Sequence, residues 1–306
     1  MIGVKKRKQS FMNNKKDLIF YALMLIWPIA QFLVFYVGVN FNSILLSFQK
    51  IDIVAGTVTW TFDNITKAFN DITGSYILLQ ALKYSLLSFV IIQGIGIPMG
   101  LVFSYYIYKK MPGSGAFRVL LFLPSIISAI VMITIFQFFV ERAIPAYAKE
   151  LFGITMKGLL ENSKTEFGTI MFYNIWVGFA TSILLYSNGM SSTDPEIVES
   201  AHIDGAIGIR EFWHITLPAT FPTLSTFIIA AFATICSNQI GLYSFYGSAS
   251  NNITTYGYYL YTHTQAATSR AEYPPLSALG LLLTIVTVPI TLLVRRLLEK
   301  FGPSEN

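Results

Sequence analysis

Charged residues are scarce in this chain. Asp, Glu, Lys and Arg make up 12% of its 306 residues, whereas 54% are hydrophobic. Soluble domains average about 25% charged residues, because charge is what covers a surface in contact with water. The shortage excludes a soluble multidomain enzyme and indicates a polytopic membrane protein. Cysteine is scarcer still: Cys236 is the only one, so no internal disulfide can form, and its apolar surroundings favour a small packing residue.

Signatures of catalysis are also missing. The sequence holds no G-x-x-x-x-G-K-[ST] phosphate-binding loop, which predicts that this chain does not itself hydrolyse ATP. The three histidines have no ligand spacing, so we expect no metal site; they are His202, His214 and His263. No serine or histidine stands in a recognisable nucleophile context. We therefore expect no catalytic residue and no enzymatic activity in this chain.

Six apolar runs are each long enough to cross a hydrocarbon core about 30 Å thick as a helix. They cover residues 18–39, 84–107, 117–140, 168–188, 219–243 and 275–294. The first run can continue through Ile44 to Phe48 as an amphipathic extension. The sequence thus predicts an all-α integral membrane protein whose six transmembrane helices occupy 18–294, between tails at 1–17 and 295–306.

Two longer segments separate the predicted spans on the side that we expect to be extracellular. The segment 49–78 carries Trp60 and Phe62, which favours a partly interfacial position. The segment 141–167 alternates Lys and Glu and predicts a small solvated helical excursion.

Basic residues crowd the segment before the first run: Lys5, Lys6, Arg7, Lys8, Lys15 and Lys16. Such a tail could bind nucleic acid or open a signal peptide. It abuts a run longer than a signal-peptide core, and no small-residue cleavage site closes that run. The positive-inside rule therefore places the tail in the cytoplasm, and the remaining Lys and Arg favour the same orientation. We expect both termini to be cytoplasmic, membrane lipid around the spans, and no nucleic acid partner.

The loop between the fourth and fifth runs, 193–218, is the most informative segment. Asp194-Pro195 predicts a helix start, because an Asp cap precedes the residue best suited to the first helical position. Gly205 is expected to break that helix before a second short apolar face. The loop is acidic, which argues against an interfacial amphipathic helix, since such helices are usually rich in Lys and Arg. A helix–Gly–helix element of this kind fits a groove on a partner protein.

This loop resembles the EAA coupling loop of importer-type ABC transporter permeases. Matching positions are Glu199, Ala201, Asp204, Gly205, Ala206, Phe212, Ile215, Leu217, Pro218 and Pro222. Ser200 replaces the middle small residue of the pattern. Further stretches are similar to the first permease of binding-protein-dependent sugar importers: 18–48, 117–124, 174–176, 255–261 and 273–280. The stretch 81–86 departs from that pattern.

The resemblance implies an importer type I ABC permease fold and uptake of a sugar or oligosaccharide across a bacterial plasma (inner) membrane. It implies a second homologous permease subunit, a cytoplasmic ATPase dimer that binds ATP and Mg, and an extracellular solute-binding protein. No cofactor is expected in this chain. It also implies that the ATPase is coupled through Glu199, Ala201, Asp204, Gly205, Ala206, Phe212 and Pro218. An ABC permease for a non-sugar solute and an ion-coupled secondary carrier remain as alternatives.

No predicted span carries an unpaired charge in its middle, which argues against ion-driven transport and suits an uncharged solute. Sugars bind to apolar faces with a few convergent amide or hydroxyl groups. The candidates for the substrate pathway are Gln137, Asn238, Gln239 and Tyr243. Hydrogen bonding between helices explains each of these amides equally well.

Overall fold

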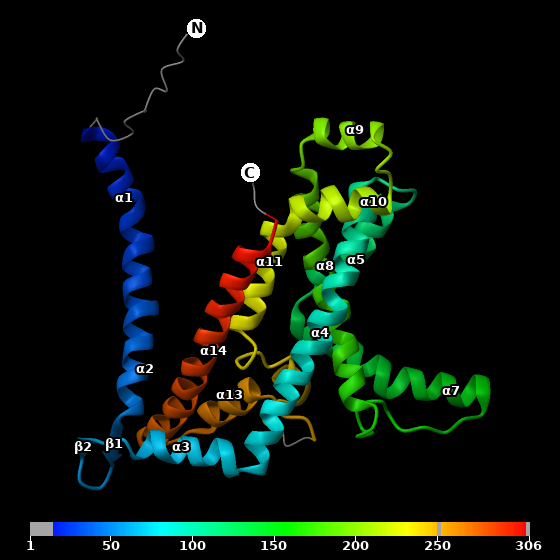
Figure 1. Ribbon diagram of the computed structural model, residues 1–306. Coiled ribbons are helices and arrows are strands. Elements are labelled where there is room, and N and C mark those ends of the chain that lie inside the picture. The colour runs from blue at the N-terminus through cyan, green and yellow to red at the C-terminus, as the bar shows by residue number, and fades with distance from the viewer. Residues whose placement is uncertain (1–14, 250–251, 304–306) are drawn as a thin grey trace.

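The structure, a computed structural model, describes residues 15–249 and 252–303. Within them, six helical segments are long and apolar enough to cross a membrane: Ile19–Ser47, Tyr76–Tyr108, Ala129–Phe152, Glu166–Ser191, Ile209–Ala233 and Arg270–Phe301. The prediction of six spans in an integral membrane protein is confirmed. One end of the bundle carries the helix α9 and is called the loop end (Figure 1). The other carries the strands β1 and β2 and is called the hairpin end.

The first span is one unbroken helix built from α1 (Lys15–Gln31), the π-helical η1 (Phe32–Gly38) and α2 (Val39–Ser47). The extension predicted beyond residue 39 is therefore helical. α1 stands apart from the other spans, whereas α2 packs against α14 (Tyr273–Phe301) near the hairpin end (Figure 1). Most of the predicted basic tail, 1–14, lies outside the described residues. α14 continues as helix to Phe301, about two turns into the tail predicted at 295–306.

α4 (Tyr76–Tyr108) and α8 (Glu166–Ser191) form the most extensive helix pair, and α11 (Leu217–Ala233) packs against α8 and α14. Small residues let these helices approach closely. A Cβ at Gly100 would lie 3.1 Å from the Tyr186 ring, and a Cβ at Gly189 would lie 3.1 Å from the hydroxyl of Thr223. The α4–α8–α11 contact is thus set by glycines facing larger side chains.

The third predicted run is divided between two helices, α5 (Ser114–Ile126) and α6 (Ala129–Phe138). Pro124 lies in the last turn of α5 and has no backbone N–H for the helix ladder. The next helix begins only after Ile127, whose backbone is extended with ψ 142°. The prediction of one continuous helix over 117–140 is therefore wrong.

The fifth predicted run, 219–243, is helical only as far as Ala233. Polar side chains then capture the backbone locally, since the Oδ1 atom of Asn238 accepts a hydrogen bond from the Ile240 N–H at 2.8 Å. Ile240 and Gly241 follow with φ of 48° and 75°, a left-handed conformation that no α-helix continues. The prediction is therefore wrong for 234–241, which forms turns that lead into the short helix α12 (Leu242–Tyr246).

The described residues are mostly helical, as predicted, and the hairpin end adds one short pair of strands. β1 (Gln49–Asp52) pairs antiparallel with β2 (Thr57–Trp60), in a register that places Gln49 opposite Trp60. Other elements at or near this end lie across the span direction (Figure 1). They are α3 (Asp63–Gly74), α7 (Ile144–Phe152) and α13 (Tyr256–Ala266). The short η2 (Phe139–Ala143) and η4 (Arg270–Glu272) directly precede α7 and α14.

A buried apolar cluster near the loop end joins the spans to the loop 193–218. Its members are Leu101, Tyr186, Met190, Phe212 and Leu224. These residues come from α4, α8, α11 and the loop itself. Burial of Phe212 in this cluster fixes the second half of the loop against the bundle.

Candidate functional site

The loop 193–218 forms two short helices across the loop end: α9 (Pro195–Ile203), and then α10 (Ile209–Glu211), which runs into the π-helical η3 (Phe212–Thr216) (Figure 1). The predicted helix start is confirmed. The Asp194 side chain accepts a hydrogen bond from the Glu196 N–H at 3.0 Å, and Pro195 takes the first helical position. This cap satisfies one of the free N–H groups at the start of α9.

Gly205 ends α9, as predicted, with a left-handed φ of 80°. The Ala206 N–H donates to the Ala201 carbonyl at 2.8 Å, which closes the turn behind it. No heavy atom lies within 4 Å of a Cβ built at Gly205, so backbone conformation and not space requires glycine. The turn leaves an open surface beside it.

The predicted coupling residues divide between the two faces of the loop. Ala201 and Phe212 are buried against the bundle, while Glu199, Asp204 and Gly205 are exposed. Ala206 and Pro218 are half-buried. Large apolar side chains are exposed beside the acidic ones: Ile203, Ile207, Ile209 and Trp213. A water-facing end that exposes this much apolar surface is typical of a protein interface.

Sequence reasoning missed Glu211, which is 0% exposed. Its carboxylate lies 2.5 Å from the Lys109 ammonium, at the end of α4, and 2.9 Å from His202 Nε2 on α9. We call these three residues the Glu211 triad. A buried carboxylate requires such partners, because burying an unpaired charge is costly. The triad therefore ties α9 and α10 to α4.

Tyr105, one turn before Lys109, makes a second link between α4 and the loop. Its hydroxyl donates to the Gly208 carbonyl at 3.0 Å, and its ring lies edge-on to Phe212 with centroids 5.1 Å apart. The available sequence signal was a carboxylate at 211 inside a stretch expected to be apolar. The pairing of this carboxylate with Lys109 could not be predicted, because nothing local in the sequence brings residue 109 close to residue 211.

The proposed substrate-pathway residues gather toward the hairpin half of the bundle, in differing roles. The Gln137 amide donates to the Phe245 carbonyl at 2.8 Å and joins α6 to α12. Asn238 shapes the turn after α11, as described above. Gln239 is half-buried, and the exposed ring of Tyr243 lies edge-on to Tyr261 at 4.7 Å. Asn238, Gln239 and Tyr243 thus lie on one short segment, whereas Gln137 serves as a structural link.

A cleft of about 350 Å³ opens among α4, α8 and α11, beside this segment. Its polar lining comprises Gln93, Asn174, Ser182 and Thr234, with Tyr186 and Phe227 among its aromatic walls. The Asn174 amide donates to the Ile240 carbonyl at 2.9 Å, which ties α8 to the turns after α11. No charged side chain lines this cleft among the described residues.

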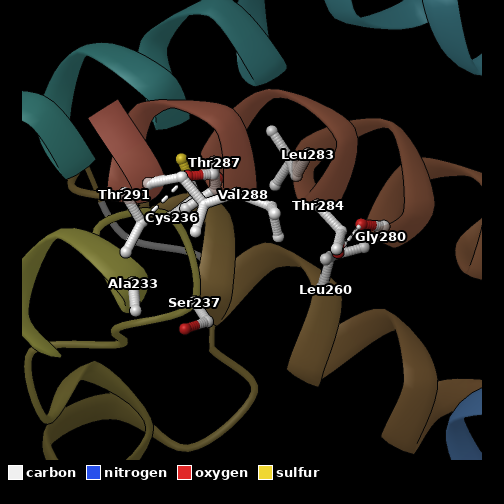
Figure 2. A pocket seen from close by; sticks show the side chains of 11 residues that line it. Ala233, Cys236, Ser237, Leu260, Gly280, Leu283, Thr284, Thr287, Val288 and Thr291 are labelled. Carbon is white, nitrogen blue, oxygen red and sulfur yellow. Dashed lines mark hydrogen bonds between the residues drawn. The ribbon is translucent and has the colours of Figure 1, made fainter. Parts of the chain in front are cut away.

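A second cavity, of about 420 Å³, lies against α14 and is more apolar. Figure 2 shows the hydroxyls of Thr284 and Thr291 bonded back to carbonyls of their own helix, Gly280 and Thr287. These hydroxyls are therefore satisfied within α14. Cys236 lines this cavity beside them, in keeping with the packing role expected for it.

Comparisons with known proteins agree with this architecture. The family of binding-protein-dependent transport system inner membrane components matches residues 94–304, more than half of the chain. The multiple sugar-binding transport system permease protein MsmF of Streptococcus mutans is 30% identical over 230 residues, which cover 73% of this chain and 77% of MsmF. The arabinooligosaccharides transport system permease protein AraP of Bacillus subtilis is 25% identical over 281 residues, which cover 89% of this chain and 86% of AraP.

A solved structure shares the fold. It is a chain of a bacterial ABC transporter involved in the import of the acidic polysaccharide alginate, with a TM-score of 0.75 and 21% sequence identity. The match covers 94% of this chain and 97% of that one. The chain therefore belongs to the family of binding-protein-dependent transport system inner membrane components, as the non-enzymatic permease subunit of an ABC importer.

Proposed function

We propose that this chain forms one half of the membrane pore of an importer for an uncharged sugar or oligosaccharide. The observation that carries the proposal is the loop 193–218, an acidic and apolar surface presented beyond the spans and held rigidly to them. The similarity to MsmF and AraP, whose names specify sugars and arabinooligosaccharides, supports the substrate class. The uncharged lining of the α4–α8–α11 cleft favours a neutral solute, because an anionic one requires basic groups.

The proposed assembly has four kinds of subunit. A second homologous permease completes the pore, a cytoplasmic ATPase dimer holds ATP and Mg, and an extracellular solute-binding protein delivers the sugar. The loop end and both termini face the cytoplasm of a bacterium, and the hairpin end faces outward across the plasma (inner) membrane. No cofactor resides in this chain.

Contacts that differ between two states of the ATPase dimer are what can move the loop. Exposed Glu199 and Asp204 are placed to pair with basic residues of an ATPase groove, while Ile203 and Ile207 fill its apolar floor. Movement of α9 then reaches α11 through the continuous chain. It reaches α4 through the Glu211 triad and the Tyr105–Gly208 hydrogen bond. Both α4 and α11 line the polar cleft, so movement of the loop alters the shape of the cleft.

The substrate pathway that we propose runs along the cleft and the turns after α11. Asn238, Gln239 and Tyr243 provide an amide and aromatic surface, and Gln93 and Asn174 extend it into the bundle. Gln137 contributes by holding α12 in place through the Phe245 carbonyl. An aromatic face with adjacent amides matches the alternating C–H and hydroxyl surfaces of a sugar ring.

The coupling role is tested by placing Gly205→Leu or Glu199→Arg in the intact importer. Each variant should insert normally and yet lose sugar uptake and sugar-stimulated ATP hydrolysis. Gly113→Leu is the matched control, because Gly113 at the same end has nearly the same φ, 79°, outside the loop. Normal uptake by both loop variants, or purification of an active importer without an ATPase subunit, would show that the assignment is wrong.

The substrate role is tested with Asn238→Ala and Gln239→Ala and a panel of labelled oligosaccharides. Loss of one neutral hydrogen bond to a sugar costs about 1 kcal/mol, so each KM for uptake should rise roughly fivefold. Unchanged sugar-stimulated ATPase activity in both variants would remove these residues from the pathway while leaving the coupling role intact.

A further inference from the structure

α7 and the return segment after it carry several large apolar side chains that the described chain leaves exposed. Ile144, Tyr147, Ala148 and Leu151 follow the i, i+3, i+4, i+7 pattern of a single helix face. Lys149 and Glu150 fall on the opposite face. This pattern gives α7 an apolar side and a polar side. The alternating Lys and Glu of 141–167 had predicted a helix surrounded by water, without an apolar side.

The apolar side of α7 is open to its surroundings. The side chains of Tyr147, Leu151 and Phe152 are 60%, 69% and 74% exposed. Ile154 and Met156 on the return segment are exposed as well. The element that packs substantially against α7 is η2, which directly precedes it in the chain. Water is a poor environment for so many adjacent large apolar side chains.

The orientation of α7 shows what covers this side. α7 projects away from the bundle and lies across the direction of the spans, in the half of the bundle nearer the hairpin end (Figure 1). α7 is the last part of the helical segment Ala129–Phe152, and in the part before α7 the side chains of Ile135, Phe138 and Phe139 are 53%, 63% and 52% exposed. A span surface of that kind in an integral membrane protein faces lipid.

We propose that α7 lies in the outer boundary of the bilayer, with its apolar side in the acyl chains and its polar side toward headgroups and water. In-plane amphipathic helices bind membranes in this way, by burying one apolar face at the level of the headgroups. Three basic side chains accompany the polar side and the return segment: Arg142, Lys149 and Lys157. They are exposed and long enough to reach lipid phosphates. The helix thus braces the α6–α8 connection against the membrane.

Spin labels at two positions test this placement in the assembled importer, reconstituted in phospholipid bilayers. Leu151→Cys reports on the apolar side and Lys149→Cys on the polar side. Both are made in a Cys236→Ser background, and the signal of that background, which comes from cysteines of the partner subunits, is subtracted. Both positions are exposed, so neither substitution disturbs packing. Relaxation by oxygen, which concentrates in lipid, is compared with relaxation by a water-soluble nickel chelate.

The proposal expects the label at 151 to be relaxed by oxygen more than by nickel, and the label at 149 to show the reverse. Equal access of nickel to both labels would mean that α7 is solvated. Low access of both reagents at 151 would mean that another subunit covers this face. Either of the last two results overturns the lipid assignment without bearing on the coupling role of the loop.

Discussion

Replacing Lys109 by Met should release the loop 193–218 from α4. The change removes the cation that lies 2.5 Å from the Glu211 carboxylate, while Glu211 stays 0% exposed. Removing one partner of a buried ion pair costs about 3–5 kcal/mol. Because His202 still bonds the carboxylate at 2.9 Å, we expect the lower limit, about 3 kcal/mol. That free energy corresponds to a roughly 150-fold larger population of the undocked loop.

Amide hydrogen exchange measures this population directly, because local opening exposes backbone groups that are otherwise protected. In the purified importer, peptides covering α9 and α10 should exchange roughly 100-fold faster in Lys109→Met, with spans far from the loop unchanged. Lys110→Met is the matched control, since Lys110 is the exposed neighbour and forms no ion pair among the described residues. ATP hydrolysis should become less dependent on sugar as α4 loses its link to the loop.

The double variant Lys109→Met with Glu211→Met separates the lost ion pair from other effects. Replacing both members of a buried pair by apolar residues is often neutral or stabilising, so slow exchange should return. Unchanged exchange in Lys109→Met would refute the reasoning. So would a double variant that exchanges as fast as the single one, because the buried charge would then not be the cause.

Two further predictions concern the hairpin half of the bundle. Gly257→Ala should lower the free energy of unfolding by about 1–3 kcal/mol, because the new Cβ would lie 2.2 Å from the Ser237 carbonyl oxygen. Gly280→Ala is the control and should melt like the wild type, because no heavy atom lies within 4 Å of a Cβ built there. Burial and the adjacent Glu166 carboxylate both raise the pKa of Tyr246, so its hydroxyl stays a donor to Glu166, at 2.9 Å, throughout the neutral range. Tyr246→Phe should therefore destabilise the complex by about 1–3 kcal/mol in melting experiments from pH 6 to pH 9, by a similar amount at each pH; a loss confined to one end of that range would contradict it.

Sequence by itself determined the features that depend on composition and on neighbours in the chain. Six spans follow from six long apolar runs, since a chain segment in lipid must satisfy its own backbone hydrogen bonds and does so as a helix. The start of α9 at Asp194-Pro195 and its end at Gly205 are local chemistry: a cap acts within one turn, and a left-handed φ is a property of one residue. The loop 193–218 could therefore be located and its outline predicted before any fold was known.

Only the tertiary structure decided how distant residues use their polar groups. Glu211 pairs with Lys109, and Gln137 bonds the Phe245 carbonyl, because helix packing brings together segments that are far apart in the chain. Hydropathy continued the fifth span to residue 243, whereas the helix ends at Ala233 and the Asn238 side chain shapes the turns that follow it. Apolar content could not separate a side chain facing lipid from one facing the bundle. That choice depends on which surfaces the packed helices leave uncovered, as the open side of α7 shows.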